Sequence, residues 1–315
     1  MFNIIVNPAG GGGKTLKLLN KIKPYLDFKN VSYVVYESSL DFGIADICRK
    51  ITLGDEVVKI ILIGGDGSLN EAVNGIRDFS LVKLGWIPCG SGNDLGRDIP
   101  LKKNPLRIID DILDEAKERK ADVAYVEAVN PEFNDGTSFN GNYRRYFNVS
   151  CGIGFDAETC VLVEQSKMKK VLNKVGLGKL IYLMEALKLF VENKKYPMEI
   201  SVDGKTEKYD KLFFIACMNH QYEGGGFRFC PDADYNDSLI DVCIAGDLKT
   251  AEMFVVMPSC LNGKHTGNKK IHMRRGKKIT IKSETALYVH TDGEAGFKAK
   301  EISIRTSSEK ITYLF

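Results

Sequence analysis

Three apolar runs in the first third of the chain each lead into a glycine-rich turn and then into a helical pattern. The three pairs are Phe2–Val6 with Gly10–Gly13, Val57–Ile63 with Gly64–Ser68, and Leu84–Cys89 with Gly90–Gly92. Strands that alternate with helices predict an open, mostly parallel sheet covered on both faces. Ligands bind at the carboxyl ends of such strands, where glycine lets backbone N–H groups approach a phosphate closely. The sequence therefore predicts an α/β domain with a phosphate site formed by three turns.

The second of these turns is the most informative. Its Asp66 can hold Mg²⁺ or a donor hydroxyl, and Ser68 with Glu71 predicts a capping box that starts a helix where a phosphate would lie. A tight βα turn that merely needs glycine is the alternative. The first turn, Asn7–Thr15, resembles a Walker A loop but has Pro8 where that motif needs glycine. Three turns that follow strands of one sheet favour a nucleotide over three unrelated bends.

The pattern changes near residue 122, which divides the chain into two predicted domains. Residues 1–122 are the α/β domain, with a last helix over 105–119, and the segment 300–315 is expected to return to it. Residues 123–299 are β-rich, antiparallel and sandwich-like, with a helical insertion over 155–192. Strands are expected at 123–129, 146–151, 197–202, 211–218, 238–245, 278–282, 285–290, 300–305 and 310–314, and Asp203-Gly204 is a hairpin signal. A cleft between the domains is the natural place for an active site.

Composition places the chain among cytoplasmic globular proteins. It is 44% hydrophobic, and no stretch has the pattern of a signal peptide or a membrane span. The eight cysteines contain no C-x-x-C pair and the four histidines show no ligand spacing. We therefore expect reduced core thiols and no zinc site.

Positive charge is concentrated in one segment. Residues 166–195 contain eight lysines and two glutamates, a local charge of +6 in a chain whose net charge is +3. This asymmetry predicts reversible association with an anionic membrane surface through Lys167, Lys169, Lys170 and Lys174. Nucleic acid is not expected as a partner, because no aromatic residues interleave with these lysines. The apolar positions of the following helix are expected to pack as a core stripe: Leu180, Leu183, Met184, Leu187, Phe190 and Val191.

An ordered set of motifs resembles the catalytic domain of diacylglycerol kinases, and the bacterial soluble lipid kinases are most similar in length. GGDG alone is shared with NAD kinases and phosphofructokinases, whereas the ordered set is far more specific and runs nearly end to end. The set comprises Asn7-Pro8 with Gly11-Gly12, Gly64–Glu71, Gly90–Asp94, Phe147–Gly154, Gly224–Phe227 with Pro231–Ala233, and Thr291–Glu294.

The resemblance implies ATP and Mg²⁺ as cofactors and a role for each matching residue. Asp66 would act on the ATP phosphates through Mg²⁺, Asp292 would be the general base for a lipid hydroxyl, and Glu294 its close partner. A second, structural Mg²⁺ would bind Asp234, Asp237 and the carbonyl of Leu239. The nucleotide would be lined by Asn7, Gly11, Gly12, Tyr36, Gly65, Asp66, Gly67, Ser68, Leu69, Asn70, Glu71, Ser91 and Asn93.

Two of these assignments carry a further condition. Ser238 stands where the family usually has glycine, so the metal loop needs a positive φ at a serine. From spacing alone, Asp292-Gly293 is a hairpin turn, and it is the resemblance that favours a general base there.

The resulting interpretation is a lipid kinase that phosphorylates diacylglycerol to phosphatidic acid, located in the cytoplasm and at the membrane surface. One alternative is a kinase of a soluble substrate such as NAD, although NAD kinases carry a separate Asn-Glu element well downstream of GGDG. Another is a nucleotide- or lipid-binding regulator without catalysis, against which Asp66 and Asp292 argue. The acceptor alcohol and the oligomeric state, a homodimer included, are not fixed by the sequence.

Overall fold

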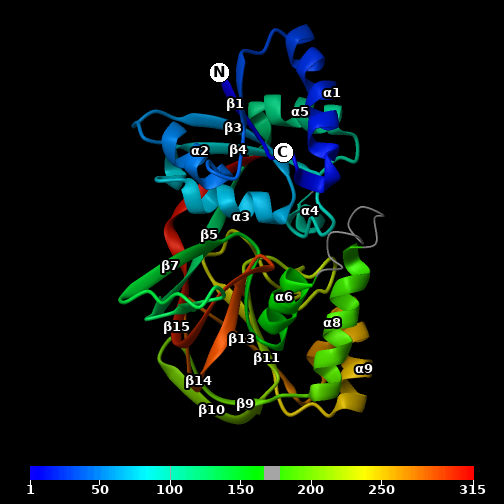
Figure 1. Ribbon diagram of the computed structural model, residues 1–315, viewed down its shortest axis with the longest axis vertical. Coiled ribbons are helices and arrows are strands. Elements are labelled where there is room, and N and C mark those ends of the chain that lie inside the picture. The colour runs from blue at the N-terminus through cyan, green and yellow to red at the C-terminus, as the bar shows by residue number, and fades with distance from the viewer. Residues whose placement is uncertain (100, 167–177) are drawn as a thin grey trace. The chain divides into compact units, whose positions relative to one another are not determined.

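The computed structural model describes residues 1–99, 101–166 and 178–315, and the chain divides into two compact units (Figure 1). Unit 1 consists of Met1–Val123 together with Ser307–Phe315, and unit 2 of Ala124–Thr306. Unit 1 is α/β with parallel strands and unit 2 is β-rich and antiparallel, which confirms the predicted fold class.

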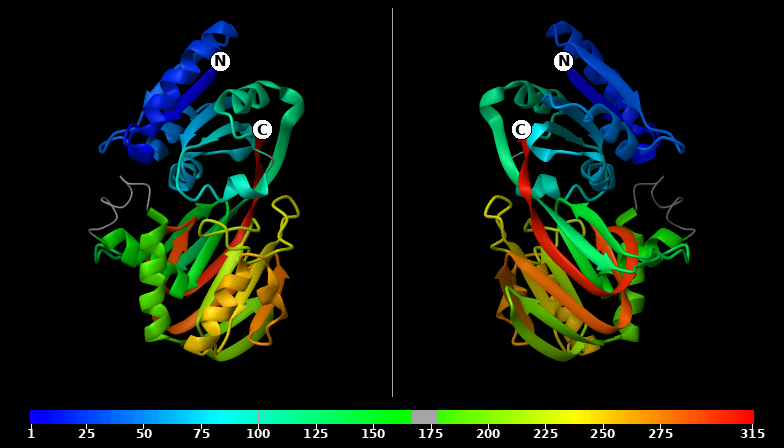
Figure 2. Two further views of the ribbon diagram at one scale, coloured as in Figure 1. Left: turned by 90° about the vertical axis from the view of Figure 1, so that its right-hand side faces the viewer. Right: turned by 90° about the vertical axis from the view of Figure 1, so that its left-hand side faces the viewer.

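Unit 1 is built on a parallel sheet with the strand order β15-β4-β3-β1-β2. Its strands are β1 (Phe2–Val6), β2 (Tyr33–Glu37), β3 (Val58–Gly64), β4 (Val82–Pro88) and the last residues of β15 (Glu294–Leu314). Its helices are α1 (Lys14–Phe28), α2 (Ile44–Ile51), α3 (Asp66–Gly75), α4 (Leu95–Asp98) and α5 (Pro105–Leu113). Figure 2 shows the C-terminal end of β15 entering this sheet beside β4, where Tyr313 pairs with Leu84.

Apolar residues cover both faces of this sheet. Phe2, Ile4 and Val6 of β1 pack in one core cluster with residues of α1 and α5, while Ile5 between them is also fully buried. On the other side, α2 contacts both α3 and β1. Parallel strands buried on both faces are continuous apolar runs in sequence, which is why these strands could be predicted.

The last helix of unit 1 is shorter than predicted. It was expected over 105–119, but α5 ends at Leu113 and β5 begins at Glu118. Asp114 adopts an extended conformation, and its carboxylate accepts a hydrogen bond from the Ala116 N–H at 3.1 Å. An aspartate that bonds to the backbone two residues onward offers the chain a turn in place of the helix.

Unit 2 is an antiparallel structure with the strand path β13-β12-β11-β8-β14-β15. In addition, β9 pairs with β14 and β10, and β5 pairs with β15 and β7. Inward-facing apolar residues of most of these strands form one core cluster. The bounds are β5 (Glu118–Val129), β6 (Glu132–Phe133), β7 (Asn142–Phe147), β8 (Ser150–Gly154), β9 (Tyr196–Val202), β10 (Lys205–Leu212), β11 (Phe214–Met218), β12 (Ile240–Ala245), β13 (Ile271–Gly276) and β14 (Lys278–Thr291), with helices α6 (Phe155–Gln165), α8 (Gly178–Glu192) and α9 (Thr250–Cys260).

Several strands of unit 2 differ from the prediction. The strands expected at 278–282 and 285–290 are one strand, β14. Its pairing with β15 shifts in register between Lys282 and Leu287, and the polar residues between them remain within the strand. Those expected at 300–305 and 310–314 are likewise one strand, β15, whereas 146–151 is divided between β7 and β8. β13 and α9 were not predicted. The Asp203-Gly204 hairpin is confirmed, since Val202 pairs with Lys205.

The described part of the apolar stripe expected on α8 is largely exposed, contrary to the prediction. Phe190 is buried at 5% exposure, but Met184, Leu187 and Val191 are 38%, 36% and 73% exposed. Two side chains of the stripe, those of Leu180 and Leu183, lie outside the described residues. So do the four lysines expected to bind the membrane: Lys167, Lys169, Lys170 and Lys174. Within the described ranges, no helix is long and apolar enough to cross a membrane.

Candidate active site

The three glycine-rich turns of unit 1 lie against one another. A Cβ atom added to Gly65 would lie 2.9 Å from Gly90 Cα, and one added to Gly11 would lie 2.7 Å from the Cys89 carbonyl oxygen. Both separations are shorter than a van der Waals contact, so the turns approach this closely only because the residues are glycine. The turns after β1, β3 and β4 therefore form one cluster at the carboxyl ends of three parallel strands.

Asp66 joins the second turn to the third through its carboxylate. Oδ2 accepts a hydrogen bond from the Asn93 N–H at 2.5 Å, and Oδ1 accepts one from the Asp94 N–H at 2.9 Å. Hydrogen bonds to an ionised carboxylate are the stronger kind. The side chain is therefore fixed within the cluster of turns. A carboxylate that binds a metal next to phosphate groups would have to lie in this place.

The start of α3 differs from the prediction. The helix begins at Asp66, and its N-cap residue Gly65 has no side chain with which to cap it. Ser68 lies within the first turn, and the Glu71 carboxylate extends towards α2, where it would lie 3.8 Å from a Cβ on Gly43. The predicted capping box is therefore wrong. Uncapped N–H groups at a helix start are suited to bind an anion.

Two asparagines of the expected nucleotide set shape the turns themselves. Asn7 Oδ1 accepts a hydrogen bond from the Ala9 N–H at 3.0 Å. Asn93 accepts one from the Gly90 N–H at 3.0 Å and donates one to the Gly90 carbonyl at 2.9 Å. Asn93 also has a φ of 53°, a conformation that asparagine tolerates better than most residues.

The remaining residues of that set lie in three different settings. Ser91 and Gly12 are exposed in their turns. Tyr36 is half-buried on β2, where it pairs with β1. Leu69 and Asn70 are 1% and 0% exposed on α3, so their side chains contribute to the packing of the unit.

Asp292 lies in the two-residue hairpin turn between β14 and β15 of unit 2. Thr291 pairs with Glu294, and the φ angles of Asp292 and Gly293 are 52° and 79°. Two successive residues with positive φ are characteristic of a type I′ turn, which favours Asp-Gly. The turn predicted from spacing is therefore confirmed.

The carboxylate of Asp292 is held by the chain between β7 and β8. Oδ1 accepts hydrogen bonds from the N–H groups of Val149 and Ser150 at 2.8 and 3.1 Å, and Oδ2 accepts one from the Asn148 N–H at 2.9 Å. The Asp292 N–H in turn donates to the Ser150 carbonyl at 2.9 Å. This network explains the break between β7 and β8, because the N–H groups of residues 148–150 bond to the Asp292 carboxylate instead of to a neighbouring strand.

The loop expected to hold a structural metal lies between β11 and β12. Asp237 Oδ1 accepts a hydrogen bond from the Leu239 N–H at 2.9 Å. Ser238 has a φ of 61°, so this serine does adopt the left-handed conformation usual for glycine. Arg275 Nη1 lies 3.8 Å from Asp237 Oδ2. Oxygen ligands of this kind suit Mg²⁺, although the guanidinium competes for the same carboxylate.

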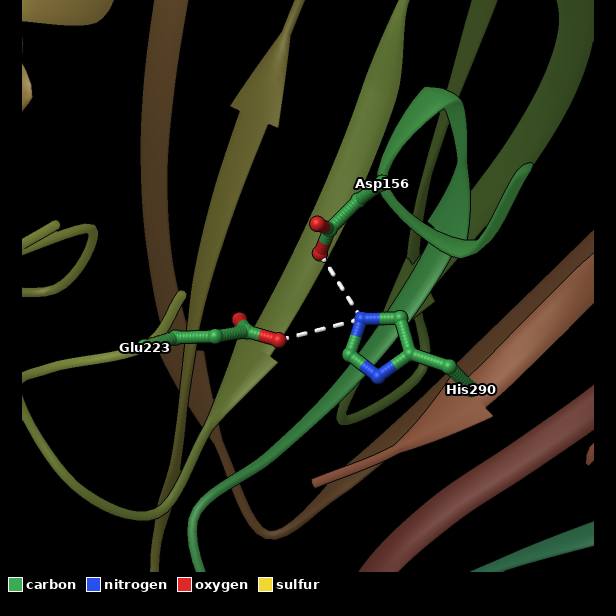
Figure 3. A group of neighbouring side chains, drawn as sticks. All are labelled: Asp156, Glu223 and His290. Carbon is green, nitrogen blue, oxygen red and sulfur yellow. Dashed lines mark hydrogen bonds and ion pairs between the residues drawn. The ribbon is translucent and has the colours of Figure 1, made fainter. Parts of the chain in front are cut away.

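A cluster of the half-buried Asp156 with the buried Glu223 and His290 in unit 2 was not predicted from the sequence (Figure 3). His290 Nε2 lies 2.8 Å from Asp156 Oδ2 and 3.0 Å from Glu223 Oε1. Burial raises the pKa of the Glu223 carboxyl to about 7, and the neighbouring Asp156 carboxylate adds to the shift. The three residues come from α6, the loop after β11, and β14, and no local spacing connects them.

Comparisons with known proteins agree with this architecture. Residues 1–126 match the family model of the diacylglycerol kinase catalytic domain, and residues 149–304 match that of the YegS C-terminal NAD kinase beta sandwich-like domain. A Bacillus subtilis protein, YtlR, provisionally named a lipid kinase, is 25% identical over 295 residues and 92% of each chain. The diacylglycerol kinase of Staphylococcus carnosus is 26% identical over 297 residues, 93% of this chain and 88% of that one.

Solved structures show the same fold. A Bacillus anthracis protein provisionally named a diacylglycerol kinase has a TM-score of 0.74 at 22% identity, with 100% of this chain and 96% of that chain covered. An NAD kinase from Archaeoglobus fulgidus, in complex with ATP, has a TM-score of 0.52 at 11% identity over 100% of this chain and 94% of that one. Residues 1–126 therefore belong to the diacylglycerol kinase catalytic-domain family, and over nearly its full length the chain is similar to kinases of lipids.

Proposed function

We propose that this protein uses ATP and Mg²⁺ to phosphorylate diacylglycerol, with Asp292 as the general base. The observation that carries the proposal is the Asp292 carboxylate, which three backbone N–H groups fix at the tip of a hairpin. Phosphoryl transfer needs positioning, charge neutralisation and a carboxylate that receives the hydroxyl proton. The diacylglycerol kinases to which the chain is similar act by this class of reaction on a lipid.

Unit 1 would bind the nucleotide. The uncapped start of α3 and the backbone N–H groups of the three turns suit phosphate oxygens. Gly11 and Gly65 would let the backbone approach the phosphates closely enough for these contacts. The Asp66 carboxylate would hold the second and third turns together. Mg²⁺, when bound beside Asp66, would neutralise phosphate charge.

Unit 2 would bind the lipid and remove its hydroxyl proton. The O–H bond of the acceptor breaks as its oxygen forms a bond to the γ-phosphorus, the proton passes to the Asp292 carboxylate, and ADP leaves. A base at a rigid turn loses little entropy in reaching the hydroxyl. Glu294, which closes the hairpin opposite Thr291, would be the partner of Asp292.

The loop of Asp234, Asp237 and Leu239 would hold a second, structural Mg²⁺. The left-handed Ser238 supports this assignment, and Arg275 opposes it. Thermal unfolding tests the loop without reference to activity. Mg²⁺ should raise the melting temperature of the wild type and not that of Asp234→Asn, and equal shifts would show that the loop binds no metal.

Reversible membrane association would deliver the lipid, and α8 is the described element that supports it. Met184, Leu187 and Val191 expose apolar side chains on this helix. Lys188, in contrast, is paired with Glu185 at 2.8 Å, so the described part of the helix offers less free positive charge than its composition predicted. We therefore expect apolar contact to contribute alongside charge attraction.

Sedimentation with phosphatidylglycerol vesicles tests this association. Val191→Asp should reduce pelleting, whereas Leu40→Asp, a matched change at an exposed leucine of unit 1, should not. A combined Lys167/Lys169/Lys170/Lys174→Glu variant tests the electrostatic part. Equal pelleting of all four proteins, wild type included, would rule out the proposed surface.

The activity is tested by incubation with labelled ATP and a mixed lipid extract. Labelled phosphatidic acid is the expected product, and Asp292→Asn should not form it. Another labelled lipid would change the acceptor, and labelled NADP from added NAD would favour the NAD kinase alternative. Absence of any labelled product over a broad lipid panel would favour a non-catalytic regulator.

A further inference from the structure

The buried side chain of His290 touches the turn that carries Asp292. Its Nδ1 accepts a hydrogen bond from the Gly293 N–H at 3.1 Å. Its Nε2 lies between Asp156 and Glu223, at 2.8 and 3.0 Å from their nearest oxygens (Figure 3). The imidazole therefore connects this acidic pair with the hairpin tip.

These two contacts determine where the imidazole carries its proton. A ring nitrogen that accepts an N–H hydrogen bond holds no proton, so Nδ1 is bare and Nε2 carries the hydrogen of a neutral ring. The Nε2–H then donates to the acidic pair. Glu223 is 5% exposed and its carboxyl lies near that of Asp156, so burial and the neighbouring charge both favour a protonated Glu223. Burial lowers the pKa of the imidazole, but the nearby Cys160, Asp156 and Glu223 side chains raise it well above 6.5. A doubly protonated ring would turn a second N–H towards the Gly293 N–H, so the hydrogen bond at Nδ1 requires the neutral form.

A divalent cation is the competing explanation for the cluster, because the three ligand atoms lie within 4.8 Å of one another. A metal on Nε2, however, would leave the ring proton on Nδ1. That proton would point at the Gly293 N–H, and the hydrogen bond would become a repulsive contact. The geometry at Gly293 therefore favours a proton on Nε2 over a metal.

We propose that His290 is a positioning residue for the lipid kinase reaction, and that it orients the Asp292 carboxylate by holding the Gly293 N–H. The proposal rests on the proposed role of Asp292. The turn is then fixed on two sides, since the segment 148–150 binds the carboxylate and His290 binds the following amide. Gly152 makes room for this arrangement, because a Cβ there would lie 2.1 Å from His290 Nε2.

Two substitutions separate the two nitrogens of His290. His290→Asn places an amide oxygen near the position of Nδ1, so it keeps an acceptor for Gly293 and loses the donor to the acidic pair. His290→Gln places an amide nitrogen near Nε2, so it keeps the donor and loses the acceptor. Both remove the buried ring, which makes each variant the stability control of the other.

The proposal predicts different kinetics for the two variants. His290→Gln should lower kcat about tenfold or more, because a base displaced by a fraction of an ångström loses its alignment with the hydroxyl. His290→Asn should stay within about threefold of the wild type, and the KM for ATP should not change in either. Equal losses that follow the loss of melting temperature would overturn the proposal. So would one equivalent of Zn²⁺ or Mn²⁺ that binds to the wild type and not to Asp156→Asn.

Hydrogen exchange of the peptide around Gly293 gives a readout independent of catalysis. Protection of the Gly293 amide should be kept in His290→Asn and lost in His290→Gln, and equal protection in both would overturn the proposal. If the wild type phosphorylates no lipid, the proposed function fails, and this exchange measurement still decides whether His290 holds the turn.

Discussion

Replacement of Asp292 by asparagine should affect stability and catalysis separately. The substitution keeps the size of the side chain but exchanges one carboxylate oxygen for an NH₂ group. One oxygen of Asp292 accepts hydrogen bonds from the N–H groups of Val149 and Ser150. The other accepts one from the Asn148 N–H and a longer one, at 3.4 Å, from Asn148 Nδ2. Whichever way the amide turns, its NH₂ must face a backbone N–H. The orientation that loses least places it against Asn148.

The size of the effect follows from these contacts. A hydrogen bond to a charged group is worth about 1.5–3 kcal/mol, and a buried N–H left without a partner costs about 1–3 kcal/mol. Asn148 is 2% exposed, so water does not replace the lost oxygen. We expect the free energy of unfolding to fall by about 3 kcal/mol, which corresponds to a melting temperature lower by about 6–12 °C. Loss of a general base should lower kcat by about 10²–10⁴-fold.

Asp203→Asn provides a matched control. Asp203 lies in the Asp-Gly turn between β9 and β10, with a φ of 48°, and its carboxylate accepts hydrogen bonds from the N–H groups of Lys277 and Lys278 at 3.0 and 2.9 Å. This variant should lose stability and keep its kcat. Both proteins are assayed for lipid phosphorylation well below their melting temperatures. Near-wild-type turnover of Asp292→Asn would refute the general base, and an unchanged melting temperature would refute the anchoring by 148–150.

Three further predictions follow from the packing and the charges. Gly152→Ala places a Cβ 2.1 Å from a buried imidazole nitrogen, so chemical denaturation should show a loss of about 1–3 kcal/mol, and an unchanged midpoint would contradict the packing. Gly90→Ala places a Cβ 2.7 Å from Gly65 Cα and should weaken ATP binding at least about tenfold by calorimetry. Gly54→Ala is the control: its Cβ would meet nothing within 4 Å, so ATP binding should not weaken. Burial raises the pKa of Glu223 from 4.5 to about 7, so its stabilising contribution is complete below pH 4.5 and is lost as the pH rises through 7. Unfolding free energy should therefore fall more steeply between pH 5 and 7.5 in the wild type than in Glu223→Gln, and parallel curves would exclude this linkage.

Most of the parallel sheet of unit 1 could be predicted because β1, β3 and β4 are buried on both faces and appear as apolar runs. Partly exposed strands were harder to recognise. β14 passes through the polar residues near Ser283 without leaving the sheet, because its neighbours supply the pairing that the local sequence does not favour. α8 was wrongly expected to bury its apolar stripe, since periodicity indicates an amphipathic helix but not what covers it.

The candidate site likewise contains features that the sequence predicts and contacts that only the fold creates. The glycine-rich turns and the Asp292 hairpin are local patterns, and the structure has them where the sequence predicted turns. The Asp66 carboxylate, in contrast, accepts hydrogen bonds from the backbone of the next turn along the sheet, which no local pattern indicated. The capping box expected from Ser68 and Glu71 was wrong because the helix begins earlier, at Asp66. The contact between His290 and Asp156 joins residues 134 positions apart, so only the fold brings them together.

Transfer of phosphate from ATP to diacylglycerol by this chain can be followed in a single competition assay. Purified protein is incubated with γ-labelled ATP, Mg²⁺ and diacylglycerol in mixed micelles, with NAD present as a competing acceptor, and the products are identified by mass spectrometry. We expect labelled phosphatidic acid from the wild type and at most about a hundredth of that rate from Asp292→Asn. Label in NADP, or equal phosphatidic acid from both proteins, would contradict this expectation.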